Sequence, residues 1–219
     1  MVCNGRACTK YTGEPHVCAP DDVPDCKLQC ERGNQESCAH YGVELLKGQK
    51  VAPDPPKGKT LLEGACSAGI GKACNGLGVI NAKGLVGAKD LPKAMKFYEQ
   101  ACEQGYMNAC FNVAYAHDIG QGVPVDQDSA ALYYVRSCAG GVGLGCMNLG
   151  IKLIEKKGHE AEGAALLARG CSGGVGHACH KLALAQQRGE GVPKDETRAK
   201  TLYRQACDMG HAPACGFAN

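Results

Sequence analysis

The stretch DLPKAMKFYEQACEQGYMNACFNVAYAHDIGQGVP, from Asp90 to Pro124, contains one complete unit of a repeating pattern. Its middle holds Cys102 and Cys110, which are separated by seven residues, and Gly105 lies three positions after the first cysteine. The same arrangement occurs six times in the 219-residue chain. Successive pairs begin 36 residues apart, except for one step of 33. A period of this length indicates a stack of near-identical structural units.

Each unit predicts two helices joined by a turn. Asp90 is a favourable N-cap, and apolar residues recur at helical spacing up to Cys102. Glycine adopts the left-handed conformation without steric cost, so Gly105 ends this first helix. The second helix follows Cys110 and stops before Pro124, because proline cannot continue a helix. The glycine of the turn is present in all six units: Gly33, Gly69, Gly105, Gly141, Gly174 and Gly210.

The two cysteines of a pair cannot be bridged within one helix. Eight positions advance a helix by about 12 Å, whereas a disulfide requires Cα atoms roughly 4.4–6.8 Å apart. The chain must therefore turn back between them, and the spacing predicts one disulfide across each turn. The predicted pairs are Cys30–Cys38, Cys66–Cys74, Cys102–Cys110, Cys138–Cys146, Cys171–Cys179 and Cys207–Cys215.

The N-terminal residues lie outside this period. We predict an irregular cysteine-rich cap over residues 1–29 and a repeat domain over 30–219, with about five repeats and the last one truncated. The remaining cysteines, Cys3, Cys8, Cys18 and Cys26, are expected to pair among themselves, and the sequence does not choose among the three possible pairings. An alternative is that Cys3 carries the lipid of a lipoprotein.

Composition limits the location and the partners. Sixteen cysteines indicate an oxidising compartment, and the absence of C-x-x-C pairs argues against a zinc protein. A net charge of +2 does not provide the excess of positive charge that is typical of nucleic-acid-binding proteins. No apolar run approaches the roughly 20 residues of a transmembrane segment. We expect a monomer, without cofactor or metal, that is secreted, periplasmic or an outer-membrane lipoprotein.

The units resemble a known family. The pattern C-x-N-L-G-x-L-x-x-x-x-G, followed by D-x-x-K-A-x-x-Y-Y-x-x-A-C-x-x-G, is similar to the Sel1-like repeat, and the copies that begin at Cys74 and Cys110 fit it best. The disulfide-bearing variant resembles the Helicobacter cysteine-rich proteins. The resemblance implies an all-α fold, a right-handed α/α solenoid that forms a TPR-like superhelix with a concave face. Members typically bind peptides or proteins there.

This resemblance leads to a binding hypothesis. We interpret the chain as an exported scaffold that holds a peptide, a protein or a cell-wall fragment on the concave face. The helix after each turn is expected to line that face, where asparagine suits an extended peptide backbone. The predicted ligand-binding residues are His40, Asn112, Asn148, Lys152 and Lys181. An equally favoured alternative is that Asn112 and Asn148 bond to the backbone of a neighbouring helix.

Two other functions follow from the family. Some cysteine-rich members bind penicillin and slowly hydrolyse β-lactams, and a mitochondrial intermembrane-space assembly factor also belongs to the group. Serine β-lactamases use S-x-x-K, but no serine of this chain has lysine three positions later, so we predict no catalytic residue. His177 and His180 could share a helix face, although such histidines are more often surface residues. Tyr133, Tyr134, Phe97 and Tyr98 are expected in the core between repeats.

Overall fold

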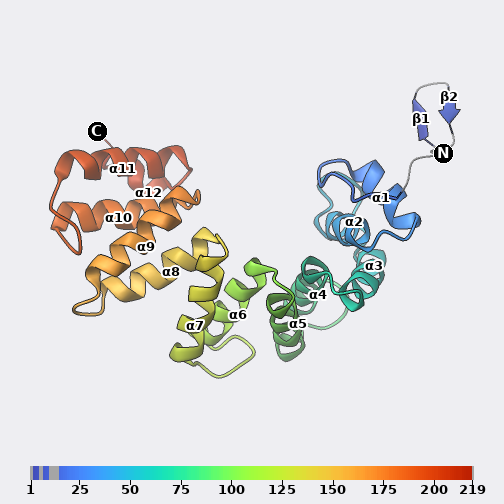
Figure 1. The fold of residues 1–219 in the computed structure, drawn as a ribbon, viewed down its shortest axis with the longest axis horizontal. Helices are drawn as coiled ribbons and strands as arrows, with labels where there is room; N and C mark the ends of the chain where they lie inside the picture. Colours follow the sequence, from blue (N-terminus) through green and yellow to red (C-terminus); the bar gives the residue numbers. More distant parts are fainter. Residues whose placement is uncertain (1, 5–6, 10–14, 219) are drawn as a thin grey trace. The chain divides into compact units, whose positions relative to one another are not determined.

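The computed structural model describes residues 2–4, 7–9 and 15–218, and most of this part is helical (Figure 1). A two-stranded antiparallel hairpin, β1 (Val2–Asn4) and β2 (Ala7–Thr9), precedes the helices. The chain divides into two compact units, Met1–Lys89 and Asp90–Asn219. The first unit contains α1 (Val23–Glu31), α2 (Gln35–Lys47), α3 (Pro55–Ser67) and α4 (Gly71–Lys83).

The second unit continues the same pattern of helix pairs. It contains α5 (Leu91–Glu103), α6 (Met107–Ile119), α7 (Gln127–Ala139), α8 (Gly143–Ile154), α9 (Glu160–Ser172), α10 (Gly176–Arg188), α11 (Glu196–Asp208) and the short α12 (Ala212–Cys215). Within each unit, consecutive helices pack against each other. The predicted all-α repeat fold is confirmed.

The turn between paired helices has one geometry throughout. In the unit of Cys102, Gly105 has a φ of +84° and its N–H donates to the Cys102 carbonyl at 3.0 Å. The N–H of Tyr106 donates to the Ala101 carbonyl at 2.9 Å. These two bonds form a Schellman motif, which satisfies the last carbonyls of the first helix. The glycines of the other five turns also have positive φ values.

A disulfide crosses each of these turns, as the spacing predicts. The Cα–Cα distances of the six bridges lie between 4.4 Å, for Cys30–Cys38, and 4.8 Å, for Cys102–Cys110. The first cysteine lies in the last turn of one helix, and the second is the fourth residue of the next. The bridge therefore joins the ends of two helices that the glycine turn has already brought together.

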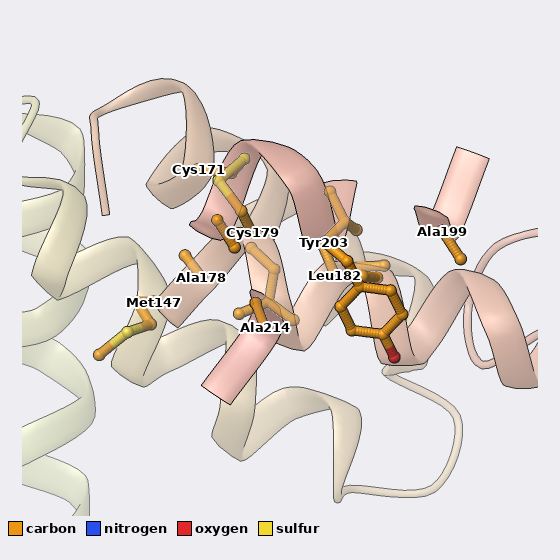
Figure 2. Packing of buried hydrophobic residues seen from close by; sticks show 12 residues of the cluster. Met147, Cys171, Ala178, Cys179, Leu182, Ala199, Tyr203 and Ala214 are labelled. Atoms are coloured by element: carbon orange, nitrogen blue, oxygen red, sulfur yellow. A yellow bond between two sulfur atoms is a disulfide. The ribbon is translucent and has the colours of Figure 1, made fainter. Parts of the chain in front are cut away.

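Small residues and the disulfides themselves form the core. In the C-terminal part of the second unit, Cys171 and Cys179 pack with Ala178, Leu182 and Tyr203, all of them buried (Figure 2). Tyr134, predicted in the core, is fully buried beside Ala130 and Leu149. Because the side chains of alanine and cysteine are small, helices in this fold can approach each other closely.

Contacts between successive repeats use the helix ends. The Arg136 guanidinium donates to the carbonyl of Cys102 at 2.9 Å, and Arg169 donates to that of Cys138 at 3.0 Å. A cation at a helix C-terminus interacts favourably with the helix dipole. Gly122, with a φ of +82°, lies so close to α5 that a Cβ there would be 2.7 Å from the Leu91 Cβ. The turn after α6 is therefore fitted against the start of α5, the first helix of the same unit.

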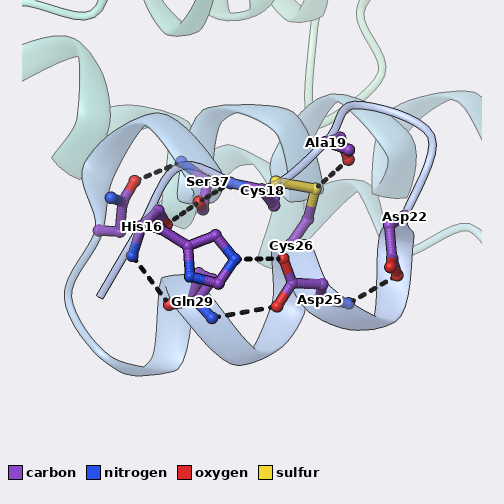
Figure 3. Close-up of polar contacts among 9 residues, drawn as sticks. His16, Cys18, Ala19, Asp22, Asp25, Cys26, Gln29 and Ser37 are labelled. Atoms are coloured by element: carbon purple, nitrogen blue, oxygen red, sulfur yellow. Dashed lines mark hydrogen bonds and ion pairs between the residues drawn. A yellow bond between two sulfur atoms is a disulfide. The ribbon is translucent and has the colours of Figure 1, made fainter. Parts of the chain in front are cut away.

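The N-terminal cap is held to α1 and α2 by a disulfide and by buried polar groups (Figure 3). Cys18 pairs with Cys26, which is the pairing that the sequence left open. The N–H of Cys18 donates to the Ser37 Oγ at 3.1 Å, and the N–H of His16 donates to the Gln29 Oε1 at 3.3 Å. Both Ser37 and Gln29 are fully buried, so these bonds satisfy groups that would otherwise destabilise the fold.

The range predicted as an irregular cap includes part of a helix, because α1 begins at Val23. The other two cysteines of this range, Cys3 and Cys8, lie opposite each other in the register of the hairpin. Their side chains lie outside the part that the structure describes. Their pairing, and the alternative of a lipid on Cys3, therefore stay predictions.

Candidate functional site

A groove lies between α8 and α10 in the second unit, where these two helices also contact each other. Its apolar lining comes from Ile151 and Ile154 on α8, Leu167 on α9 and Leu184 on α10. The groove holds about 250 Å³ of open space. This volume is below the usual range of about 300–1,000 Å³ for small-molecule pockets, and it fits one or two side chains of a peptide.

The apolar lining has an origin in the repeat. The position five residues after the second cysteine is apolar in five successive copies: Val43, Val79, Tyr115, Ile151 and Leu184. The α8 helix adds Ile154, where α10 has Gln187 at the equivalent position and α6 has Asp118. These neighbouring apolar side chains remain partly exposed and line the groove.

Charged residues line the rim of the groove. Arg188 forms an ion pair with Glu190 at 3.6 Å, and Glu155 lies on the α8 side. Lys181 also lines the groove, but within the part of the chain that the structure describes its ammonium forms no hydrogen bond or ion pair. The groove therefore combines an apolar floor with one unpaired cation, and Lys181 is the predicted site residue that lies in it.

Two other predicted site residues share a hydrogen-bond network beside this region. The Lys152 Nζ lies 2.6 Å from the Asp118 Oδ1 and donates to the Gln127 Oε1 at 2.8 Å. The Asn148 Nδ2 donates to the Tyr134 hydroxyl at 2.9 Å, and that hydroxyl donates to the Asp118 Oδ2 at 3.1 Å. Asn148 thus bonds to a side chain of the neighbouring helix, which neither sequence interpretation foresaw.

The network sets the protonation of its members. Burial opposes ionisation of Asp118, but the hydrogen bonds from Lys152 and Tyr134 outweigh it and lower the pKa of Asp118. Burial raises the pKa of Tyr134, and the nearby Asp118 carboxylate adds to this effect. Tyr134 therefore remains a donor and Asp118 an acceptor at neutral pH. Lys152 and Asn148 join successive helices in this arrangement.

The remaining predicted residues lie elsewhere. Asn112 is half-buried on α6. His40 lies on α2 in the first unit, where its Nδ1 is 2.8 Å from the Lys72 Nζ. The structure thus places Asn148 and Lys152 in one network and Lys181 in a groove, with His40 in a different compact unit. The ligand-binding role of these five residues stays a prediction.

Three histidines meet at the end of the second unit. His177 stacks on His211 with ring centroids 5.0 Å apart, and His180 meets His211 edge-on at 4.9 Å. Burial lowers the pKa of His177 and of His180, and His211 lowers both further. Over residues 15–218, no group of three or more His, Cys, Asp or Glu side chains has an arrangement that could hold a metal ion.

The serines do not form a hydrolase site in the described residues. Ser37 is buried on α2, where it accepts a hydrogen bond from the N–H of Cys18, and Ser137 is buried before Cys138. Ser129 donates to its own N-cap residue Asp126 at 2.7 Å. Over residues 15–218, no serine hydroxyl bonds to a lysine or histidine side chain. A serine nucleophile needs an adjacent base, and the contact of Ser129 with the Asp126 carboxylate belongs to the N-cap of α7.

Comparison with known proteins identifies the repeat. A family profile described as the Sel1 repeat matches residues 35–70, 71–106, 108–142 and 176–211, which is well over half of the chain. The segment between the last two matches holds α8 and the shortened connection to α9. No curated protein matches the chain in sequence.

Solved structures share the fold. A protective antigen of uropathogenic Escherichia coli, described as displaying an SLR fold, is 25% identical over 89% of this chain and 42% of its own, with a TM-score of 0.79. A Sel1 repeat protein from Oxalobacter formigenes is 22% identical over 88% of this chain and 56% of its own, with the same TM-score. The chain thus spans about half the length of these two relatives.

A smaller relative is also found. Cysteine rich protein B of Helicobacter pylori is 23% identical over 57% of this chain and 95% of its own, with a TM-score of 0.49.

Among the described helices, none is both long enough and apolar enough to span a bilayer.

Proposed function

Because the chain belongs to the Sel1 repeat family, we propose that it is an interaction scaffold that holds an extended peptide segment of a partner protein in the groove between α8 and α10. Repeat folds of this kind provide surfaces for protein interaction. Seven disulfides among the described residues indicate an oxidising, extracytoplasmic compartment. We therefore place the scaffold and its partner outside the cytoplasm, and we expect the scaffold to act as a monomer.

The observation that supports this site most strongly is the unpaired ammonium of Lys181 at the rim of an apolar groove. An extended peptide presents alternate side chains to a surface. One branched apolar side chain would lie on Ile151, Ile154 and Leu184, while the carboxylate of the residue two positions away would pair with Lys181. The partner segment is therefore a leucine or isoleucine two positions from an aspartate or glutamate, or close to a C-terminal carboxylate.

The other functions have less support. Hydrolysis of a β-lactam and a role in mitochondrial assembly rest on the family resemblance, and no arrangement of described residues adds to either. A cell-wall fragment would need a site for sugars, and the apolar lining of the groove fits a peptide better.

The test measures binding of a fluorescent heptapeptide that has Leu-Ser-Asp in a Gly-Ser background, by fluorescence anisotropy. We expect Lys181→Gln to weaken binding about tenfold, which is the loss of one charge-assisted hydrogen bond. The matched control is Lys200→Gln on the exposed face of α11, which should bind like the unchanged protein.

A second peptide with Asn in place of Asp completes a double-mutant cycle. This peptide should bind the unchanged protein about tenfold more weakly and should lose nothing further with Lys181→Gln. Equal affinity of the unchanged protein and Lys181→Gln for the Leu-Ser-Asp peptide contradicts the proposed site. So does the absence of measurable binding to that peptide by the unchanged protein.

A further inference from the structure

A lysine in the first unit has an unusual environment that the binding function does not use. Lys72 is the second residue of α4, and its Nζ lies 2.8 Å from the Nδ1 of His40 on α2. Lys72 is half-buried. Over residues 15–218, no carboxylate forms an ion pair with it, since the nearby Glu44 pairs with Lys47 at 3.3 Å.

The position on the helix disfavours the charged form of this amine. The first turn of a helix carries the positive end of the helix dipole, where a cation is destabilised. The N-cap of α4 is Ile70, whose side chain offers no hydrogen bond to that turn. Burial lowers the pKa of Lys72, and the Lys47 ammonium lowers it further, while Glu44 and Glu36 on α2 act in the opposite direction.

The partner of Lys72 is the imidazole of His40, which can accept a proton when it is neutral. For the ammonium or amine of Lys72 to donate to the Nδ1 of His40, that nitrogen must carry a lone pair. Burial lowers the pKa of His40 and the Lys72 charge adds to this effect, against Glu36 and Glu44. At neutral pH the imidazole is therefore uncharged, and it lies within hydrogen-bond distance of a lysine nitrogen whose pKa is lowered by burial.

We propose that Lys72 is a site of N-acylation, in which its amine takes an acyl group from an activated ester or anhydride with His40 as the proton acceptor. The lone pair of the Lys72 nitrogen forms a bond to the carbonyl carbon of the donor, and the bond from that carbon to the leaving oxygen breaks. The leaving group departs as an alkoxide or carboxylate. The proton that the nitrogen must lose passes to the Nδ1 of His40 and then to water.

The product fits the site better than the starting amine. Acylation replaces a half-buried ammonium by a neutral amide, which relieves both the desolvation of the charge and its repulsion from Lys47. The new amide N–H still has a donor hydrogen, so it can keep the bond to His40. The contact at 2.8 Å thus serves both states.

The experiment is competitive labelling of the folded chain with a limiting amount of acetic anhydride at several values of pH between about 7 and 10. Mass spectrometry of the peptides then gives the relative rate of acetylation of each lysine. We expect Lys72 to react at least about threefold faster than Lys83 near pH 7.5, because more of its amine is neutral there. Lys83 is the internal control, since it is an exposed lysine on the same helix.

Two variants separate the parts of the proposal. His40→Leu should slow the reaction at Lys72 several-fold and leave Lys83 unchanged, with the helical circular dichroism signal preserved. Lys72→Arg keeps a cation but should lose the modified peptide. If Lys72 reacts no faster than Lys83 at every pH, the proposed site is wrong. An unchanged rate at Lys72 in His40→Leu contradicts the role of the histidine.

Discussion

Side chains that differ between the copies of the repeat form hydrogen bonds to residues of the preceding helices. The sequence predicts that Lys152 and Asn148 face a ligand, yet their hydrogen-bond partners are Asp118, Gln127 and Tyr134 on the two preceding helices. Asp118 is 34 positions away from Lys152. The sequence spacing gives the helix and its exposed face, but such a pair depends on how successive helices stack, and no local pattern predicts that.

The Tyr134 hydroxyl is a sensitive test of this network. Tyr134→Phe removes a donor to Asp118 and an acceptor from Asn148 in a buried place, so we expect the free energy of unfolding to fall by about 1–2 kcal/mol. Denaturation by urea, followed by circular dichroism, measures this change. Tyr203→Phe is the matched control, because among the described residues that hydroxyl bonds only to the exposed Gln187, and water can replace this bond. Equal losses in the two variants would refute the assigned importance of the network.

At the scale of the element, the turn between paired helices is the part that the sequence predicts best. Cysteine and glycine recur together in it, and each has one physical reason for its place. The bridge of Cys18 to Cys26 has the same separation of eight. It could have been found from this spacing, but Asp21 stands where the repeat has glycine, and Pro20 and Pro24 interrupt the pattern. The cap consequently looked irregular.

Substitutions at two glycines distinguish the cost of backbone strain from the cost of a packing clash. Gly105 has a positive φ and no atom near a built Cβ, so Gly105→Ala should destabilise the fold by about 1–2 kcal/mol from backbone conformation alone. Gly122 has a similar φ, but a Cβ there would also meet the backbone of Leu91 at 2.9 Å. We expect Gly122→Ala to destabilise the fold by more than Gly105→Ala in the same urea titration. The reverse order would show that the connection after α6 does not pack tightly on α5.

At the scale of the whole molecule, covalent closure compensates for a weak apolar core. The chain has three Phe, no Trp and thirty-one Gly, and much of its buried surface comes from alanine and cysteine. Each disulfide closes a loop of about nine residues, which stabilises the folded state by about 2.5 kcal/mol in the chain-entropy model. The repeat fold and its disulfides were predictable from periodicity. The groove was only partly so, since the apolar position is visible in each copy but the unpaired state of Lys181 is not.

The most direct test of this account is the far-ultraviolet circular dichroism of the chain at about 25 °C in excess dithiothreitol, with complete reduction confirmed by thiol counting. If disulfides supply most of the net stability, which for a domain is only about 5–15 kcal/mol, the helical signal should largely disappear on reduction. It should return when the bridges re-form. A fully reduced chain that retains all of its helicity would contradict the claim that the bridges hold the repeats together.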